Sequence, residues 1–167
     1  MTKSPVMHED QVREFYYNTE FNEDGSLHTL VGDKRVQLNE ELLGEILEVP
    51  KEGIRSMAGK LCTQHFANEF IQKKLMKGEY QLLFEFVNKV VLPRSEKHTI
   101  ANSADLFLME SLYKFDPLNL PALILEHMHK MVIEQKGKHG MGYGYFLTKV
   151  FNHQKVSVGP RTVGTVK

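Results

Sequence analysis

The sequence predicts a mainly α-helical fold, formally α+β, in which a single helical domain carries one small antiparallel β-hairpin near residues 27–38. Apolar residues recur at helical spacing along most of the chain, whereas strict apolar–polar alternation is confined to two short segments on either side of Gly32. The length of 167 residues suits one domain. We expect that domain over residues 12–153, between a flexible N-terminus (1–11) and a flexible basic tail (154–167).

The first expected element is a short helix over about residues 9–17, because Val12, Phe15 and Tyr16 fall at i, i+3 and i+4. The stretch NEDGS follows it. Its Asn and Asp side chains can bond to the nearby backbone, and its glycine tolerates positive φ. A turn is therefore expected directly after the first helix.

The hairpin is expected to turn at Gly32 and Asp33, because a glycine at the first central position is what a type II′ turn requires. The register that follows pairs Leu27 with Leu38, Thr29 with Val36 and Val31 with Lys34. It gathers the apolar side chains on one face and leaves Leu30 exposed among His28, Arg35 and Gln37. We expect the apolar face to pack against the helix that comes next.

Asn39 is placed to cap that next helix, whose leucine-rich stripe ends before Pro50. Apolar spacing predicts further helices along the rest of the chain, over about residues 61–77, 80–91, 103–113, 120–134 and 145–153. The expected boundary residues are Gly78, Pro93, Asn102 or Ser103 as a cap, Asn119 as a cap and Pro121 in a first turn. The segment 51–60, which contains Gly53 and Gly59, is expected to be a loop or one irregular turn.

Bulk composition limits the class of protein. Hydrophobic residues make up 41% of the chain and charged residues 25%, as in ordinary globular domains. No apolar run reaches the roughly 18–20 residues of a membrane span, and the N-terminus lacks the apolar core of a secretory signal. We therefore expect a cytoplasmic or nuclear protein without a membrane partner. A single cysteine, Cys62, excludes an internal disulfide and a multi-cysteine zinc site.

Charge is unevenly spread along the chain, although the net charge is zero. Residues 1–60 carry seven basic against twelve acidic side chains, and residues 127–167 carry seven against one. The C-terminal excess permits contact with polyanions, and a solvated tail is the alternative explanation. The candidate nucleic-acid contacts are Lys130, Lys136, Lys138, Lys149, Lys155 and Arg161.

Residues suited to catalysis or to metal binding are sparse. Cys62 and His65 have a spacing that a nucleophile and its base could use, but no orienting carboxylate or amide lies nearby in sequence. His127 and His129 are two positions apart, so on a helix they point in different directions and cannot share one ion. We predict no catalytic, cofactor-binding or metal-binding residues and no cofactor.

The aromatic residues offer little for stacking on bases. Among Phe84, Phe86, Phe107, Tyr113 and Phe115, only Phe86 and Phe115 lie off the apolar stripes of the expected helices. Two off-stripe rings are too few for a base-stacking platform.

The order of several motifs resembles a known family. These motifs are VREFYYNTEF with the hairpin and its helix, then FVNKVVLPRS, ADLFLMESLYKFDPLNLPALILEHM and GYGYFLTKVFNH. Together they resemble the putative plant transposon protein domain, found in reading frames tied to plant retroelements, over roughly residues 12–153. The hairpin and its helix are more distantly similar to the plant mobile domain. Where the family has a Gly-Lys turn, Asp33 stands between Gly32 and Lys34.

The resemblance implies no established catalytic residues. Such frames often carry a helical segment before VREFY, and eleven residues precede Val12, so we expect a truncated or domesticated fragment. The leading hypothesis is a non-enzymatic, transposon-derived domain that acts through protein–protein contacts. The alternative is a nucleic-acid-associated protein that uses its basic C-terminal region, and a third reading is a hydrolase that uses Cys62.

Overall fold

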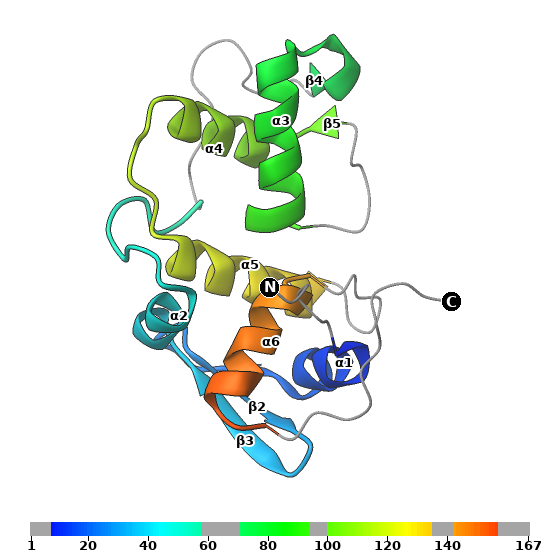
Figure 1. Cartoon of the computed structure of the whole chain (residues 1–167), viewed down its shortest axis with the longest axis vertical. Coiled ribbons are helices and arrows are strands. Elements are labelled where there is room, and N and C mark those ends of the chain that lie inside the picture. Colours follow the sequence, from blue (N-terminus) through cyan, green and yellow to red (C-terminus); the bar gives the residue numbers. More distant parts are fainter. Residues whose placement is uncertain (1–7, 58–70, 94–99, 135–141, 157–167) are drawn as a thin grey trace, which may run out of the picture. The chain divides into compact units, whose positions relative to one another are not determined.

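The computed structural model describes residues 8–57, 71–93, 100–134 and 142–156. Within them the chain forms six α-helices, a three-stranded antiparallel sheet and a separate two-stranded pairing (Figure 1). The predicted mainly α-helical fold with a small β-hairpin is therefore confirmed. In the described part of the chain, no helix combines the length and the apolar character that crossing a bilayer requires.

The chain divides into two compact units. Unit 1 consists of Met1–Val49 and Met128–Lys167, and unit 2 consists of Pro50–His127. The division falls inside helix α5 (Leu120–Glu134). The expected domain limits at residues 12 and 153, and the flexibility expected outside them, stay predictions.

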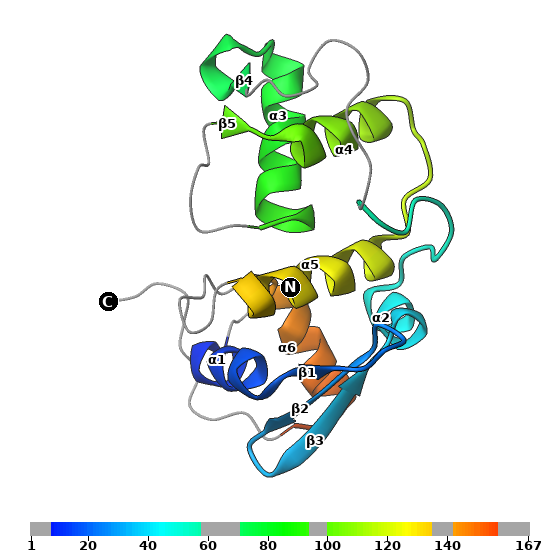
Figure 2. The ribbon, with the colours of Figure 1, turned by 180° about the vertical axis from the view of Figure 1, so that it is seen from behind.

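Unit 1 contains three further helices and the sheet. They are α1 (Glu9–Asn18), β1 (Glu20–Phe21), β2 (Leu27–Val31), β3 (Lys34–Leu38), α2 (Glu40–Leu47) and α6 (Gly144–His153). The first, second and last predicted helices are thus confirmed. α6 lies between α1 and α2 (Figures 1 and 2). Phe15 of α1 and Phe151 of α6 are fully buried, with ring centroids 6.1 Å apart.

The hairpin has the predicted turn and register. Gly32 has a φ of +59°, and β2 pairs with β3 so that Leu27 faces Leu38 and Val31 faces Lys34. The apolar face is buried, and Leu30 is 49% exposed on the other face. The alternating pattern and the turn residues favour the same register. A register shifted by one residue would expose the apolar side chains of the hairpin to solvent.

The hairpin packs chiefly against α1, so the expectation that it covers the following helix is wrong. The Thr29 hydroxyl donates to the Phe15 carbonyl at 2.8 Å, and the Gly32 amide donates to the Glu14 carboxylate at 2.9 Å. α2 instead buries Leu43 against α6. The alternating pattern shows which face of the hairpin is buried, but it does not specify which helix covers that face.

The sheet also has a third strand that the sequence pattern did not reveal. β1 pairs with β2 through Glu20 with His28 and Phe21 with Leu27 (Figure 2). The predicted turn at NEDGS is confirmed, and it joins these two strands: Gly25 has a φ of +86° and donates its amide to the Asn22 carbonyl at 3.0 Å. Two residues are too few to carry an alternating pattern.

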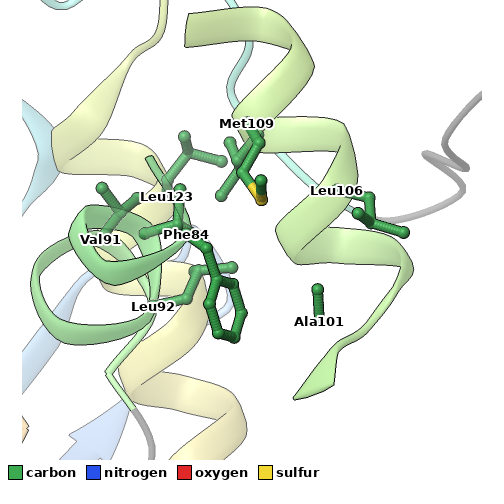
Figure 3. Close-up of a cluster of buried hydrophobic side chains, with 9 residues drawn as sticks. Phe84, Val91, Leu92, Ala101, Leu106, Met109 and Leu123 are labelled. Carbon is green, nitrogen blue, oxygen red and sulfur yellow. The ribbon is translucent and has the colours of Figure 1, made fainter. Parts of the chain in front are cut away.

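Unit 2 is built around α3 and α4. Its elements are β4 (Ile71–Gln72), η1 (Lys73–Leu75), α3 (Gly78–Phe86), the π-helical turn η2 (Val87–Val91), β5 (Ile100–Ala101), α4 (Ser103–Tyr113) and the start of α5. Phe84, Val91, Met109 and Leu123 meet in its core (Figure 3). The predicted helices around residues 80–91, 103–113 and 120–134 are confirmed.

The predicted helix over residues 61–77 is wrong at its C-terminal end, and residues 61–70 lie outside the described residues. Ile71–Gln72 is extended and pairs with Ile100–Ala101. Gly78 begins α3 instead of ending the preceding helix. The helical spacing was a local signal, and pairing with a segment distant in sequence overrode it.

All three predicted asparagine caps are confirmed. The Asn39 side chain accepts from the Leu42 amide at 2.7 Å, and the Asn119 side chain accepts from the Ala122 amide at 3.1 Å. Asn102 forms a reciprocal capping box with Asp105, with both bonds at 2.9 Å. Each cap satisfies a backbone donor that a helix start leaves without a partner.

The loop predicted at 51–60 is tied to the start of α5 over its described part. Ile54 donates its amide to the Pro117 carbonyl at 3.0 Å, and the buried Asn119 side chain donates to the Lys51 carbonyl at 2.8 Å. Gly53 lies against Pro117 so closely that an added Cβ would sit 2.1 Å from the Pro117 oxygen. With a φ of +106°, Gly53 occupies a conformation that suits glycine.

Candidate functional site

Three of the six candidate phosphate contacts lie in the described part of the chain. Lys130 is on α5, Lys149 is on α6 and Lys155 follows α6, and all three are exposed. The other three candidates, Lys136, Lys138 and Arg161, lie outside the described residues. The structure therefore leaves the predicted basic site untested.

The fold places these three lysines in a unit that is otherwise acidic. Between His8 and Val49, which belong to unit 1, the sequence has eleven acidic residues and three basic ones. The basic C-terminal region and the acidic N-terminal region are thus parts of one unit. Nearby acidic charge lowers the positive potential that attracts a polyanion.

The histidines considered as metal ligands have separate contacts. His127 Nε2 lies 2.8 Å from the Pro93 carbonyl, which can only accept, so this nitrogen carries the proton. His129 stacks on Phe21, with ring centroids 4.4 Å apart. Within the described residues, no group of three or more His, Cys, Asp or Glu side chains could hold a metal ion. Cys62 and His65 lie outside the described residues.

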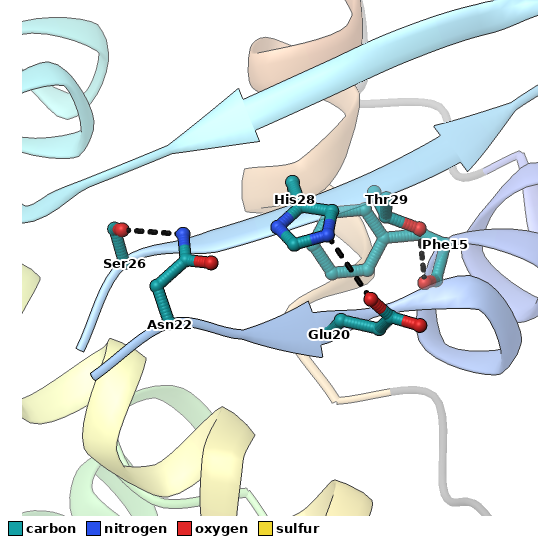
Figure 4. A network of polar contacts seen from close by, with 6 residues as sticks. All are labelled: Phe15, Glu20, Asn22, Ser26, His28 and Thr29. Carbon is teal, nitrogen blue, oxygen red and sulfur yellow. Dashed lines mark hydrogen bonds and ion pairs between the residues drawn. The ribbon is translucent and has the colours of Figure 1, made fainter. Parts of the chain in front are cut away.

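A polar network lies along β1, β2 and their turn (Figure 4). His28 Nε2 is 3.1 Å from a Glu20 carboxylate oxygen, and the Asn22 side chain donates to the Ser26 hydroxyl at 2.9 Å. The Ser26 hydroxyl and amide both donate to Asp24, and these bonds hold the pKa of the Asp24 carboxyl below its usual range. All of these hydrogen bonds join residues of β1, β2 and the turn between them, so these polar groups stabilise the strand pair.

Comparison with known families identifies the chain. A family model described as "Putative plant retrotransposon-related domain" matches residues 1–157. The chain belongs to this family. The predicted resemblance to a plant transposon domain is confirmed, and the family supports a transposon-derived origin. Searches of curated proteins and of solved structures gave no match.

One residue of the retrotransposon-related domain combines backbone strain with an exposed ring. Phe115, two residues after the end of α4, has a φ of +58°, and its side chain is 93% exposed. The Phe115 amide donates to the Leu112 carbonyl at 3.2 Å and the Asp116 amide donates to the Ser111 carbonyl at 2.9 Å. These two bonds form a Schellman motif, whose left-handed position is usually glycine.

The same motif ends two other helices. Glu48 after α2 has a φ of +57° and Lys155 after α6 has a φ of +56°, each with the corresponding pair of bonds. The sequence pattern did not reveal these three positions, because none of them is a glycine. Pro50 and Pro117, each two residues after the left-handed residue, were the available signal.

Proposed function

We propose that this retrotransposon-related domain acts through protein–protein contacts and not through catalysis, as an assembly part of the element's machinery. The observation that carries the proposal is Phe115, an exposed aromatic side chain in a strained backbone conformation. Glu48 and Lys155 have the same backbone conformation, so the exposed aromatic ring is what distinguishes Phe115 from them.

Both the backbone conformation and the exposed ring of Phe115 raise the free energy of the isolated chain. A left-handed conformation costs a non-glycine residue about 1–2 kcal/mol. The exposed ring leaves a large apolar surface in water. A partner that buried the ring would turn this surface into binding energy, because buried aromatic residues dominate interface energetics.

A second aromatic residue lies at the same end of α4. Tyr113 is 55% exposed, and its ring centroid is 5.7 Å from that of Tyr80 on α3. Tyrosine suits the edge of an interface, since its ring is apolar and its hydroxyl can remain in water. Tyr113 and Phe115 therefore define the surface that we propose as the contact.

Phe115→Gly tests the proposal. We expect the variant to be about 1 kcal/mol more stable to denaturant, because glycine accepts the left-handed conformation without strain. We also expect it to lose the proteins that the wild-type domain captures from nuclease-treated plant extract. Gain of stability together with loss of capture separates a contact residue from a structural one.

Glu48→Gly is the matched control, because it makes the same backbone change at the same motif without removing an aromatic ring. It should gain stability and keep the captured proteins. If Phe115→Gly captures the same proteins as Glu48→Gly, Phe115 is not the contact. If nuclease treatment removes all captured proteins, nucleic acid holds them and the proposal fails.

A further inference from the structure

Among the described residues, β3 is an edge strand of the sheet of unit 1. Its strand order is β1-β2-β3, so one side of β3 faces β2 and the other faces away from the sheet. Val31 and Lys34 flank the two-residue turn and form a hydrogen-bonded pair. Because the pairs alternate, the backbone groups of Arg35 and Gln37 point away from β2.

A side-chain amide occupies the outward groups of Gln37. The Gln154 side chain donates its N–H to the Gln37 carbonyl at 2.6 Å, and its Oε1 accepts from the Gln37 amide at 3.4 Å. A primary amide has the same donor and acceptor as a peptide group. Gln154 therefore bonds to β3 as one residue of an added strand would.

The end of α6 holds Gln154 in this place. The backbone amide of Gln154 donates to the Val150 carbonyl at 3.0 Å. The Schellman bond from the Val156 amide to the Phe151 carbonyl, at 2.9 Å, fixes the turn that follows. Val156 is buried, and so is Phe151. The covering amide thus belongs to a packed helix end.

We propose that the outer edge of β3 is a strand-addition surface that Gln154 keeps closed, and that a second copy of this chain pairs there when the amide is removed. Unpaired strand edges template association with other strands, and proteins cover them for that reason. This surface lies in unit 1 and does not depend on the contact proposed for Phe115 in unit 2.

A second copy fits this edge in sequence and symmetry. A two-fold axis through Val36 would pair β3 with itself in antiparallel fashion. Arg35 would then face Gln37 of the second copy, and Lys34 would face Leu38. No like charges would be directly opposite each other in this pairing, so it carries no electrostatic penalty of that kind.

Gln154→Ala is the direct test, with sedimentation and light scattering over a series of protein concentrations. We expect the variant to dimerise at least about tenfold more tightly than wild type. Gln154→Met, which keeps the length but removes the amide, should behave in the same way. Asn152→Ala, an exposed change on the same helix, is the matched control and should match wild type.

A second change locates the new interface. Arg35→Pro removes an outward-pointing N–H, a change that an edge strand tolerates, so in the Gln154→Ala background it should restore the wild-type association. Hydrogen exchange in Gln154→Ala alone should show the Arg35 amide becoming protected as concentration rises. Association unchanged in both Gln154 variants would overturn the proposal, and so would a dimer that leaves the Arg35 amide unprotected.

Discussion

Gly53 shows how one residue can fix the path of a loop. Its φ of +106° and its contact with the Pro117 backbone leave no room for a side chain. Gly53→Ala should therefore destabilise the chain by at least about 2 kcal/mol, since the alanine adds both strain and a clash with backbone atoms. Denaturant unfolding measures this loss.

Gly78 supplies the comparison for that measurement. It begins α3, and an added Cβ there meets no atom within 4 Å. Gly78→Ala should be neutral or should stabilise by up to about 1 kcal/mol, because alanine favours the helix. If the two substitutions changed stability equally, the contact of Gly53 with Pro117 would not contribute to stability.

Two buried tyrosines predict sensitivity to alkali. Burial raises the pKa of Tyr16 and of Tyr143 above the usual value, and the Tyr16 hydroxyl donates to the Gly142 carbonyl at 2.5 Å. The folded state therefore favours the neutral phenols. The two phenols contribute fully to the free energy of unfolding below about pH 10, where unfolded tyrosine is still protonated. This contribution is lost as the pH rises above that value.

The free energy of unfolding should therefore fall above pH 10, by up to about 1.4 kcal/mol per pH unit for each of the two phenols. Tyr16→Phe should cost about 1 kcal/mol at neutral pH through the lost hydrogen bond, yet reduce the alkaline slope. Denaturant unfolding at several pH values measures both effects. An alkaline slope identical in wild type and variant would show that the pKa of Tyr16 is the same in the folded and unfolded states.

Among the elements, the helix starts capped by asparagine were the most predictable feature. Asn39, Asn102 and Asn119 cap the helices at which the sequence placed them, because a cap depends on residues within three positions. The reciprocal partner Asp105 was not predicted, although its place three residues after Asn102 was a readable signal.

Asn102→Ala should destabilise the chain by about 1 kcal/mol, through loss of the bond from the Asp105 amide. Asn102→Asp keeps an accepting oxygen and should restore most of the loss. The comparison uses denaturant unfolding. An alanine variant as stable as wild type would mean that the capping box contributes nothing at this helix start.

Short strands were the least predictable elements. The hairpin was predicted with its register because ten residues around one glycine carry the alternating pattern. β1, β4 and β5 have two residues each, and their pairing depends on residues that are not adjacent in sequence. The candidate basic site stays a prediction, and linear charge spacing did not reveal that an acidic segment belongs to the same unit.

At the scale of the molecule, charge balance argues against strong binding of nucleic acid. The chain has no net charge, and Lys149 and Lys155 share a unit with an acidic N-terminal segment. We therefore expect weak binding of DNA or RNA even at about 50 mM salt. Fluorescence anisotropy with labelled oligonucleotides measures this affinity.

Lys149→Glu and Lys155→Glu should change that weak binding little. The alternative function, contact through the basic C-terminal region, requires a tight complex that weakens steeply with salt and is impaired by both changes. That result would replace protein–protein contact as the leading proposal for this retrotransposon-related domain.

Local sequence patterns were enough to specify the hairpin with its turn, the caps, and most of the helices with their buried faces. These depend on interactions between residues a few positions apart, so a short window contains the cause. Only the folded chain shows that α1 and not α2 covers the hairpin and that Gln154 bonds to β3. Each of these depends on where a segment distant in sequence packs, and only the folded chain brings those segments together.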